Sequence, residues 1–325
     1  MTTWVKPTIL SSRCIEFDHC RYDGSMIASD FVKKIKPYVD FVTVCPEVEI
    51  GLGIPRKSLR LVQVNNEKRL IQPATNKDVT TSMISFAQSF LSEQRHIHGV
   101  ILKTRSPSCG IKDVKVYAAQ NNAASIKKTA GLFGEKVLQT FPGVVESEGR
   151  LRNSYIQEHF LVSIFTIASF DHIKKNLSMA DLVKFHSNNK FLFMAYNQEI
   201  LREMGRVVAN QTQGKVEQVF HQYEDLLYSI FTRPPSHKTT INVLHHLFGF
   251  VSDDLNESEK SFFLDLVQKY REEKIPLTVV THVLKSWVIR FAESYLSDQT
   301  FFNPFPEELL EDELSAIADK QRYWI

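Results

Sequence analysis

The sequence predicts an α/β N-terminal domain with a mostly parallel, Rossmann-like sheet, followed by an all-α C-terminal domain. In the first 150 residues, short β-branched apolar segments alternate with helical segments, a pattern typical of a parallel sheet. From about Tyr155 onward the apolar residues recur with helical spacing, and few strand signals remain. The length of 325 residues suffices for two domains that each bury a core. We place these domains at residues 1–150 and 151–325.

The N-terminal domain is expected to contain several short strands and two long helices. Strands are predicted at residues 7–12, 38–45, 59–64, 69–72, 99–103 and 144–146. The segments 59–64 and 69–72 lie on either side of Asn65-Asn66-Glu67-Lys68, which indicates a hairpin. Helices are predicted at about 78–94, with Asp78 as the capping residue, and at about 125–140.

The C-terminal domain is expected to consist of amphipathic helices. They are predicted at residues 177–186, 191–209, 214–230, 238–251, 258–273 and 277–296. Asn256-Glu257-Ser258-Glu259 is a typical helix start, and Pro276 separates the last two helices.

Composition and charge exclude some classes of protein. No apolar run approaches the roughly 20 residues that a membrane span needs, so no membrane partner is expected. The N-terminus has neither the basic start nor the apolar stretch of a secretory signal, so a cytoplasmic location is expected. The net charge is only +2, so any surface that binds nucleic acid must be local. The sequence leaves the oligomeric state open.

All four cysteines lie in the first third of the chain. Cys14, Cys45 and Cys109 each lie in or just before the loop that follows a predicted strand. In an open parallel sheet these loops gather along one edge, where ligand sites are usual, so we expect the three thiols to converge. Buried inert thiols, a nucleophile and metal ligands are the alternatives for such cysteines. Both zinc and iron–sulfur clusters accept thiolates, and the residues alone do not choose between them.

Four motifs in the first half carry a resemblance to a known family. They are Ser12-Arg13-Cys14, Cys20-Arg21-Tyr22-Asp23-Gly24, Cys45-Pro46-Glu47-Val48 and Lys103-Thr104-Arg105-Ser106-Pro107-Ser108-Cys109-Gly110. Together, over residues 7–148, they resemble the thiouracil desulfidase (TudS) family. The order of the four motifs is more specific than any one of them.

The second half resembles a YbgA-type helical domain. The resemblance rests on Leu182-Val183-Lys184-Phe185-His186, Met194-Ala195-Tyr196, His245-His246-Leu247-Phe248-Gly249-Phe250 and Phe302-Asn303-Pro304-Phe305-Pro306. The two halves together look like the fused architecture of the RudS-type tRNA 4-thiouridine desulfidases. The partners that this resemblance implies are tRNA carrying 4-thiouridine or a small thiopyrimidine.

The resemblance implies a [4Fe–4S] cluster held by three cysteines, with one iron open to substrate. Carried over by motif, the ligands are Cys14, Cys45 and Cys109, and Cys20 is not counted among them. The implied activity is a non-redox, hydrolytic desulfidase that converts 4-thiouridine in tRNA, or a related thiolated pyrimidine, to the oxygen form. Such a hydrolysis needs a general base within reach of the attacking water.

Glu47, two residues beyond Cys45, is the best candidate for this base. A structural hydrogen bond to backbone amides is the competing interpretation. Ser108 and Ser106 are candidates for binding the pyrimidine or relaying a proton, with turn capping as the alternative role.

RNA contacts are predicted at Lys184, His186, Lys190 and Arg206, because the segment 172–215 has a local surplus of basic residues. Arg21 and Arg105, beside the cysteine motifs, are predicted to support the site or to contact RNA phosphate. Ordinary solvated helix faces and structural salt bridges are the alternative interpretation. Two rival functions also stay open. One is a free thiouracil or thionucleobase desulfidase whose helical domain mediates oligomerisation. The other is a non-catalytic iron–sulfur RNA-binding module, which would need Cys20 as a fourth ligand.

Overall fold

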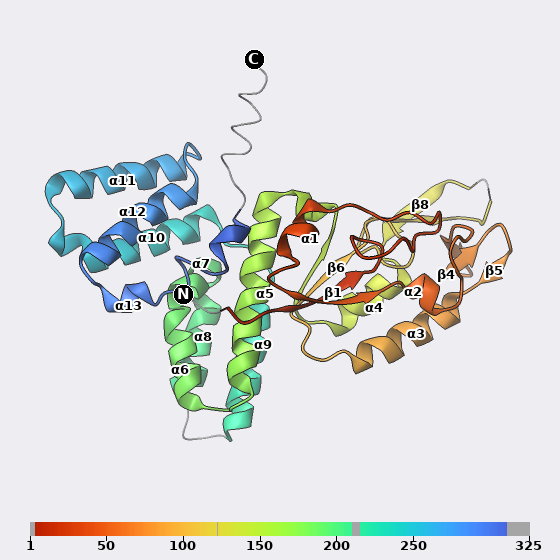
Figure 1. Ribbon diagram of the computed structural model, residues 1–325, viewed down its shortest axis with the longest axis horizontal. Helices are drawn as coiled ribbons and strands as arrows, with labels where there is room; N and C mark the ends of the chain where they lie inside the picture. Colours follow the sequence, from red (N-terminus) through yellow and green to blue (C-terminus); the bar gives the residue numbers. More distant parts are fainter. Residues whose placement is uncertain (1–3, 122, 210–214, 311–325) are drawn as a thin grey trace, which may run out of the picture. The chain divides into compact units, whose positions relative to one another are not determined.

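The computed structural model describes residues 4–121, 123–209 and 215–310 (Figure 1). The described residues divide into two compact units, one made of those up to 168 together with 308–310 and the other of those between 169 and 307. The first unit is α/β and the second is helical. The predicted fold class is confirmed.

The first unit contains two sheets. The first sheet has the strand order β2-β1-β6-β9 and every pair in it is parallel. Its strands are β1 (Thr8–Ser12), β2 (Asp40–Val44), β6 (Gly99–Leu102) and β9 (Val144–Ser147). The second sheet has the order β5-β4-β3-β7-β8, in which only β3 and β7 pair in parallel. Its strands are β3 (Arg60–Val64), β4 (Glu67–Gln72), β5 (Lys77–Asp78), β7 (Val114–Tyr117) and β8 (Ser125–Thr129).

Helices cover both faces of the first sheet (Figure 1). On one face, Leu10, Val100 and Leu102 form a core cluster with side chains of α3 (Thr80–Glu93) and α4 (Leu132–Thr140). On the other face, Gly99 lies against Phe160 and Ile164 of α5 (Ser154–Lys174), so that an added Cβ would come within 2.5 Å of the Ile164 side chain. The central strands are therefore buried on both faces, as parallel strands usually are.

Helix α5 is buried on nearly all sides from Phe160 to Ala168. The fully or nearly fully buried residues there are Phe160, Leu161, Val162, Ile164, Phe165, Ile167 and Ala168. A helix that is apolar all round shows no amphipathic stripe, which is why amphipathic spacing did not predict it. Among the described residues, no helix has the length and apolar character needed to cross a membrane.

The predicted helix at 125–140 is wrong in its first part. Residues Ser125–Thr129 form strand β8, which pairs antiparallel with β7, and the helix begins only at Leu132. Four of the five β8 residues are exposed, so they offer no apolar face that would favour a helix against the core. Strand β7 and the short helices α1 (Asp30–Ile35) and α2 (Pro46–Glu49) were not predicted.

The second unit consists of helices with short connections. They are α6 (Met179–Asn188), α7 (Lys190–Tyr196), α8 (Gln198–Ala209), α9 (Val216–Ile230), α10 (His237–Val251), α11 (Glu257–Arg271), α12 (Leu277–Arg290) and α13 (Ser294–Ser297). Two predicted helices, 191–209 and 277–296, are each broken into two, the first at Asn197 and the second after Arg290. Gly214, the predicted start of another helix, lies outside the described residues.

Candidate active site

Three cysteines follow three neighbouring parallel strands. Cys14 comes after β1, Cys45 comes after β2 and Cys109 lies in the loop after β6. The order β2-β1-β6 places the carboxyl ends of these strands side by side. All three thiols are free and buried, and they line one cavity of about 280 Å³. The structure thus brings Cys14, Cys45 and Cys109 together.

Cys20 lies in the same cavity. Its side chain is fully buried and contacts both the Cys14 and the Cys45 thiols. The contact with Cys14, together with burial, raises the pKa of the Cys20 thiol to about 11. The Cys45 thiol also points to the Cys20 carbonyl oxygen, 3.7 Å away. Sequence motifs had set Cys20 apart from the other three, whereas the loop after β1 folds back and places it among them.

The Cys109 loop is held by hydrogen bonds from its own serines. Ser106 Oγ accepts from the backbone N–H groups of Ser108, at 3.2 Å, and of Cys109, at 3.0 Å. Ser106 therefore caps the turn that carries Cys109. Burial raises the pKa of the Cys109 thiol. A thiol in such a site is neutral at physiological pH until a metal replaces its proton.

Two glycines of the segment that begins α4 allow the Cys109 loop to pack closely. A Cβ at Gly131 would lie 2.5 Å from the Ser108 carbonyl oxygen, and a Cβ at Gly134 would lie 2.4 Å from the Gly110 carbonyl oxygen and 2.7 Å from that of Cys109. The position of the thiol thus depends on the absence of side chains in the neighbouring helix.

We expect Gly134→Ala to displace the Cys109 loop, since backbone oxygens cannot move aside as a flexible side chain can. The expected loss is about 1–3 kcal/mol in the free energy of unfolding, measured by urea denaturation. Gly249→Ala is the matched control: a Cβ there, in helix α10, meets nothing within 4 Å, and about 0.5–1 kcal/mol of stabilisation is expected. Equal effects of the two substitutions would contradict the packing argument.

Glu47 is held by Ser108 and by an arginine that the motifs did not single out. The Ser108 hydroxyl donates to Glu47 Oε1 at 2.8 Å, and Arg56 Nε donates to Glu47 Oε2 at 2.8 Å. The side chain of Glu47 is 12% exposed and that of Arg56 is 4% exposed. Glu47 and Arg56 therefore form an ion pair that is almost fully buried.

Arg56 also connects Glu47 to the cysteine loops. Its Nη1 donates to the carbonyl oxygens of Cys20, at 3.0 Å, and Gly53, at 3.1 Å. Its Nη2 lies 3.8 Å from Cys45 Sγ. The chain returns to the cavity here through a turn in which Gly51 has φ +81° and Gly53 has φ +72°. No sequence spacing marks this return, which is why Arg56 was missed.

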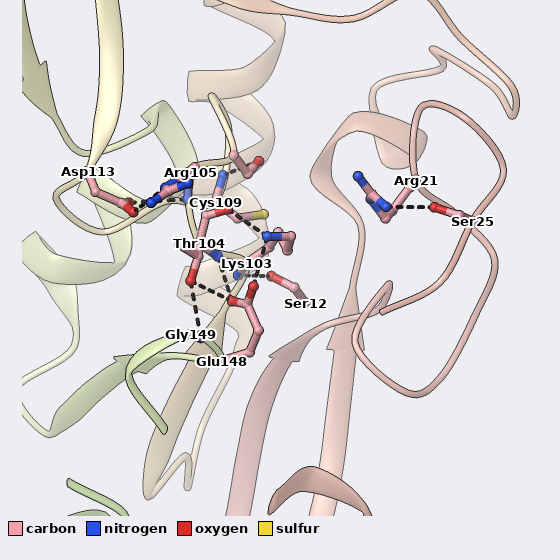
Figure 2. Close-up of polar contacts among 11 residues, drawn as sticks. Ser12, Arg21, Ser25, Lys103, Thr104, Arg105, Cys109, Asp113, Glu148 and Gly149 are labelled. Carbon is pink, nitrogen blue, oxygen red and sulfur yellow. Dashed lines mark hydrogen bonds and ion pairs between the residues drawn. The ribbon is translucent and has the colours of Figure 1, made fainter. Parts of the chain in front are cut away.

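A second polar network fixes the start of the Cys109 loop (Figure 2). Lys103 Nζ donates to Glu148 Oε1 at 2.8 Å, and the Thr104 backbone and hydroxyl donate to Glu148 Oε2 at 2.6 and 2.9 Å. The backbone N–H of Lys103 donates to Ser12 Oγ at 3.0 Å, which joins this loop to the end of β1. These contacts link the segments that carry Cys14 and Cys109.

The predicted RNA contacts of the first unit lie at the rim of the cavity. Arg21 and Arg105 both line it. Arg21 Nη1 donates to Ser25 Oγ at 2.7 Å, and Arg105 lies on a separate loop with its side chain 83% exposed beside Asp113 (Figure 2).

The other predicted RNA contacts lie in the second unit. Lys184, Lys190 and Arg206 are exposed on α6, α7 and α8. His186 instead lies against Tyr223, with 3.1 Å between Nδ1 and the phenol oxygen. Burial, helped by the charge of Lys190, lowers the pKa of His186. All of these RNA contacts stay predictions.

Comparison with known proteins agrees with the two-part organisation. Residues 9–149 match the family described as 2-thiouracil desulfurase, and residues 190–306 match a family described as a protein of unknown function, DUF1722. The chain is 25% identical to Escherichia coli (strain K12) YbgA over 148 residues, which is 45% of this chain and 88% of YbgA. It is 35% identical to Bacillus subtilis (strain 168) YbbK over 109 residues, which is 31% of this chain and 72% of YbbK.

One solved structure also matches: the [4Fe-4S]-dependent thiouracil desulfidase TudS. It is 24% identical in sequence and matches with a TM-score of 0.36, over 45% of this chain and 94% of the TudS chain. The motifs, the matched residue ranges and the identity to YbbK agree on the family. The chain belongs to the 2-thiouracil desulfurase family, with a TudS-like domain fused to a YbgA-like helical domain.

Proposed function

We propose that this protein is an iron–sulfur-dependent desulfidase that converts 4-thiouridine in tRNA to uridine. One observation carries the proposal: Cys14, Cys45 and Cys109 line a single cavity together with a carboxylate, Glu47, that is bonded to Ser108. A cytoplasmic location, where thiols stay reduced, agrees with four free cysteines.

The residues of the cavity fit a cluster. Within the described ranges, no group of three or more His, Cys, Asp or Glu side chains could hold a metal ion. An iron–sulfur cluster makes a different demand, because each iron takes one thiolate and the ligands surround the whole cluster. Buried cysteines around a cavity of about 280 Å³ offer soft donors of this kind. We infer that Cys14, Cys45 and Cys109 are the ligands.

The reaction is a hydrolysis in which water replaces sulfide at a ring carbon, and it needs no oxidant or reductant. A bound cluster with one open iron would supply a Lewis acid for the sulfur of the substrate. Glu47 accepts the proton of the attacking water. Ser108 and Arg56 each bond one oxygen of Glu47, and they therefore orient the carboxylate toward the cavity.

The test is anaerobic reconstitution with iron and sulfide, followed by measurement of sulfide release from thiolated tRNA and from free 4-thiouracil. We expect release from both, with the greater kcat/KM on thiolated tRNA. Release from free 4-thiouracil alone would instead support a free-base desulfidase whose helical domain mediates oligomerisation. If neither thiolated tRNA nor free 4-thiouracil released sulfide, the proposal would be wrong.

The burial of Cys20 among the other thiols favours a second candidate. If Cys20 were the fourth ligand, every iron would carry a thiolate, and the protein would be a non-catalytic iron–sulfur RNA-binding module. Cys20→Ser separates the two functions. A desulfidase keeps its cluster and its turnover in this variant, whereas a module with four thiolate ligands loses or rearranges its cluster.

A further inference from the structure

A second hollow adjoins the cysteine cavity on the second sheet of the first unit. It measures about 540 Å³ and is lined by residues of β3, β7 and β8 and of the segment 105–114. We call it the β7–β8 groove. Ser58, Leu59, Arg105 and Pro107 line both the groove and the cysteine cavity. The two hollows therefore adjoin each other and share part of their lining.

The lining of the groove is strongly basic. It contains four basic side chains and one carboxylate: Arg60, Arg105, Lys115, Lys128 and Asp113. Lys115 and Lys128 lie directly opposite each other on the antiparallel strands β7 and β8, and both are exposed. In the described part of the chain, neither lysine forms an ion pair with a carboxylate.

This pair of lysines opposes local stability. Like charges directly opposite each other in a sheet are destabilising, and among the described strands β8 lies at the edge of the sheet, beside β7. A bound anion between the two ammonium groups would remove the repulsion. The arrangement is thus suited to holding a negatively charged group at the surface.

Arg105 lies where the hollows meet. It lines the cysteine cavity, the groove and a third hollow of about 420 Å³ that also contains Lys112 and Arg152. Its backbone has a φ of +58°, and its N–H donates to Asp113 Oδ1 at 3.1 Å. Non-glycine residues in this conformation are often found at ligand clamps. Asp113 thus holds the loop, and its Oδ2 also lies 3.6 Å from Arg105 Nε in an ion pair that leaves the Arg105 side chain 83% exposed.

The groove also offers a surface for a base. The Arg60 guanidinium lies over the ring of Tyr117, 4.2 Å from its centroid. Tyr117 is half-buried and lines the groove. A tyrosine ring beside lysines and arginines is typical of surfaces that bind single-stranded nucleic acid, where a base stacks and the backbone phosphates meet the charges.

We propose that the β7–β8 groove binds the polynucleotide phosphates on one side of the thiolated nucleotide, with that base in the cysteine cavity. This inference rests on the proposed function. It assigns the phosphate contacts next to the reacting base to the desulfidase unit itself, in addition to any contacts made by the helical unit. A free thiopyrimidine has no phosphate and would leave the groove empty.

The test compares Lys128→Glu with Lys127→Glu in the full chain. Both residues are exposed on β8, but Lys127 pairs with Val116, so its side chain points to the other face of the sheet. We expect Lys128→Glu to weaken binding of thiolated tRNA by about tenfold and the Lys115→Glu/Lys128→Glu double variant to lower the slope of log K against log salt by about 2. Lys127→Glu should stay close to the wild type.

Turnover of free 4-thiouracil is the second measurement, and it should not change in the groove variants. Equal losses of tRNA affinity in Lys127→Glu and Lys128→Glu would overturn the proposal that the β7–β8 groove binds phosphates, since the effect would then be one of overall charge. A parallel fall in free-base turnover would also overturn it. If the wild type released no sulfide from any substrate while tRNA binding still depended on Lys128, the groove would stand and the proposed function would fail.

Discussion

Replacement of Cys14, Cys45 or Cys109 by alanine is expected to give a colourless protein without desulfidase activity. Each thiol follows a different strand of the first sheet, and the three surround one cavity. Loss of one leaves two of the proposed ligands, too few to hold three corners of a cluster. Iron and sulfide content and visible absorbance after anaerobic reconstitution are the measurements, with sulfide release from thiolated tRNA alongside.

Cys20→Ser is the matched control for these substitutions. Cys20 is as deeply buried as the others and contacts Cys14 and Cys45, so its loss perturbs the same cavity without removing a proposed ligand. We expect this variant to bind iron in the wild-type ratio and to keep most of its turnover. A colourless Cys20→Ser protein would show four-thiolate ligation and would contradict the open iron. A coloured, active alanine variant at Cys14, Cys45 or Cys109 would contradict the proposed ligand set.

The position of these cysteines could be predicted because it depends on local signals and one topological rule. The strand that precedes each cysteine is a short β-branched or apolar segment, and the carboxyl ends of neighbouring parallel strands meet at one edge of the sheet. Glu47 could be predicted as a candidate because it lies on the same loop as Cys45. Its partner Ser108 lies 61 residues away in sequence, and it was found only because its own motif contains Cys109.

Other features depend on contacts between segments that are distant in the sequence, and no local sequence pattern predicts such contacts. Residues Ser125–Thr129 are a strand only because β7 pairs with them, and their own composition gives no buried face. Helix α5 has apolar residues on all sides, so the spacing of its apolar residues does not mark it as an amphipathic helix. Arg56 reaches Glu47 through the turn at Gly51 and Gly53. Its guanidinium also contacts the backbone of Cys20 and the Cys45 thiol.

Glu47→Ala is expected to keep the cluster and lose turnover. Glu47 is not one of the proposed ligands, and its two oxygens already bond Ser108 and Arg56. Removal of a general base lowers the rate by about 10²–10⁴-fold, and we expect a fall in kcat of that size. Absorbance and iron content should stay at the wild-type level. The measurement is single-turnover sulfide release from thiolated tRNA.

Glu47→Ala also leaves Arg56 buried without its partner. Breaking a buried ion pair from one side costs about 3–5 kcal/mol, so we expect the free energy of unfolding of Glu47→Ala to fall by about that amount in addition to the loss of turnover. Glu47→Gln is the better test, because the amide keeps the size of the side chain. Its oxygen can still accept from Arg56 and its N–H can donate to the Ser108 hydroxyl, but the amide cannot accept a proton from water. A folded, coloured and inactive Glu47→Gln protein supports proton transfer by Glu47. Wild-type turnover in that variant would assign the carboxylate a structural role and move the base elsewhere in the cavity.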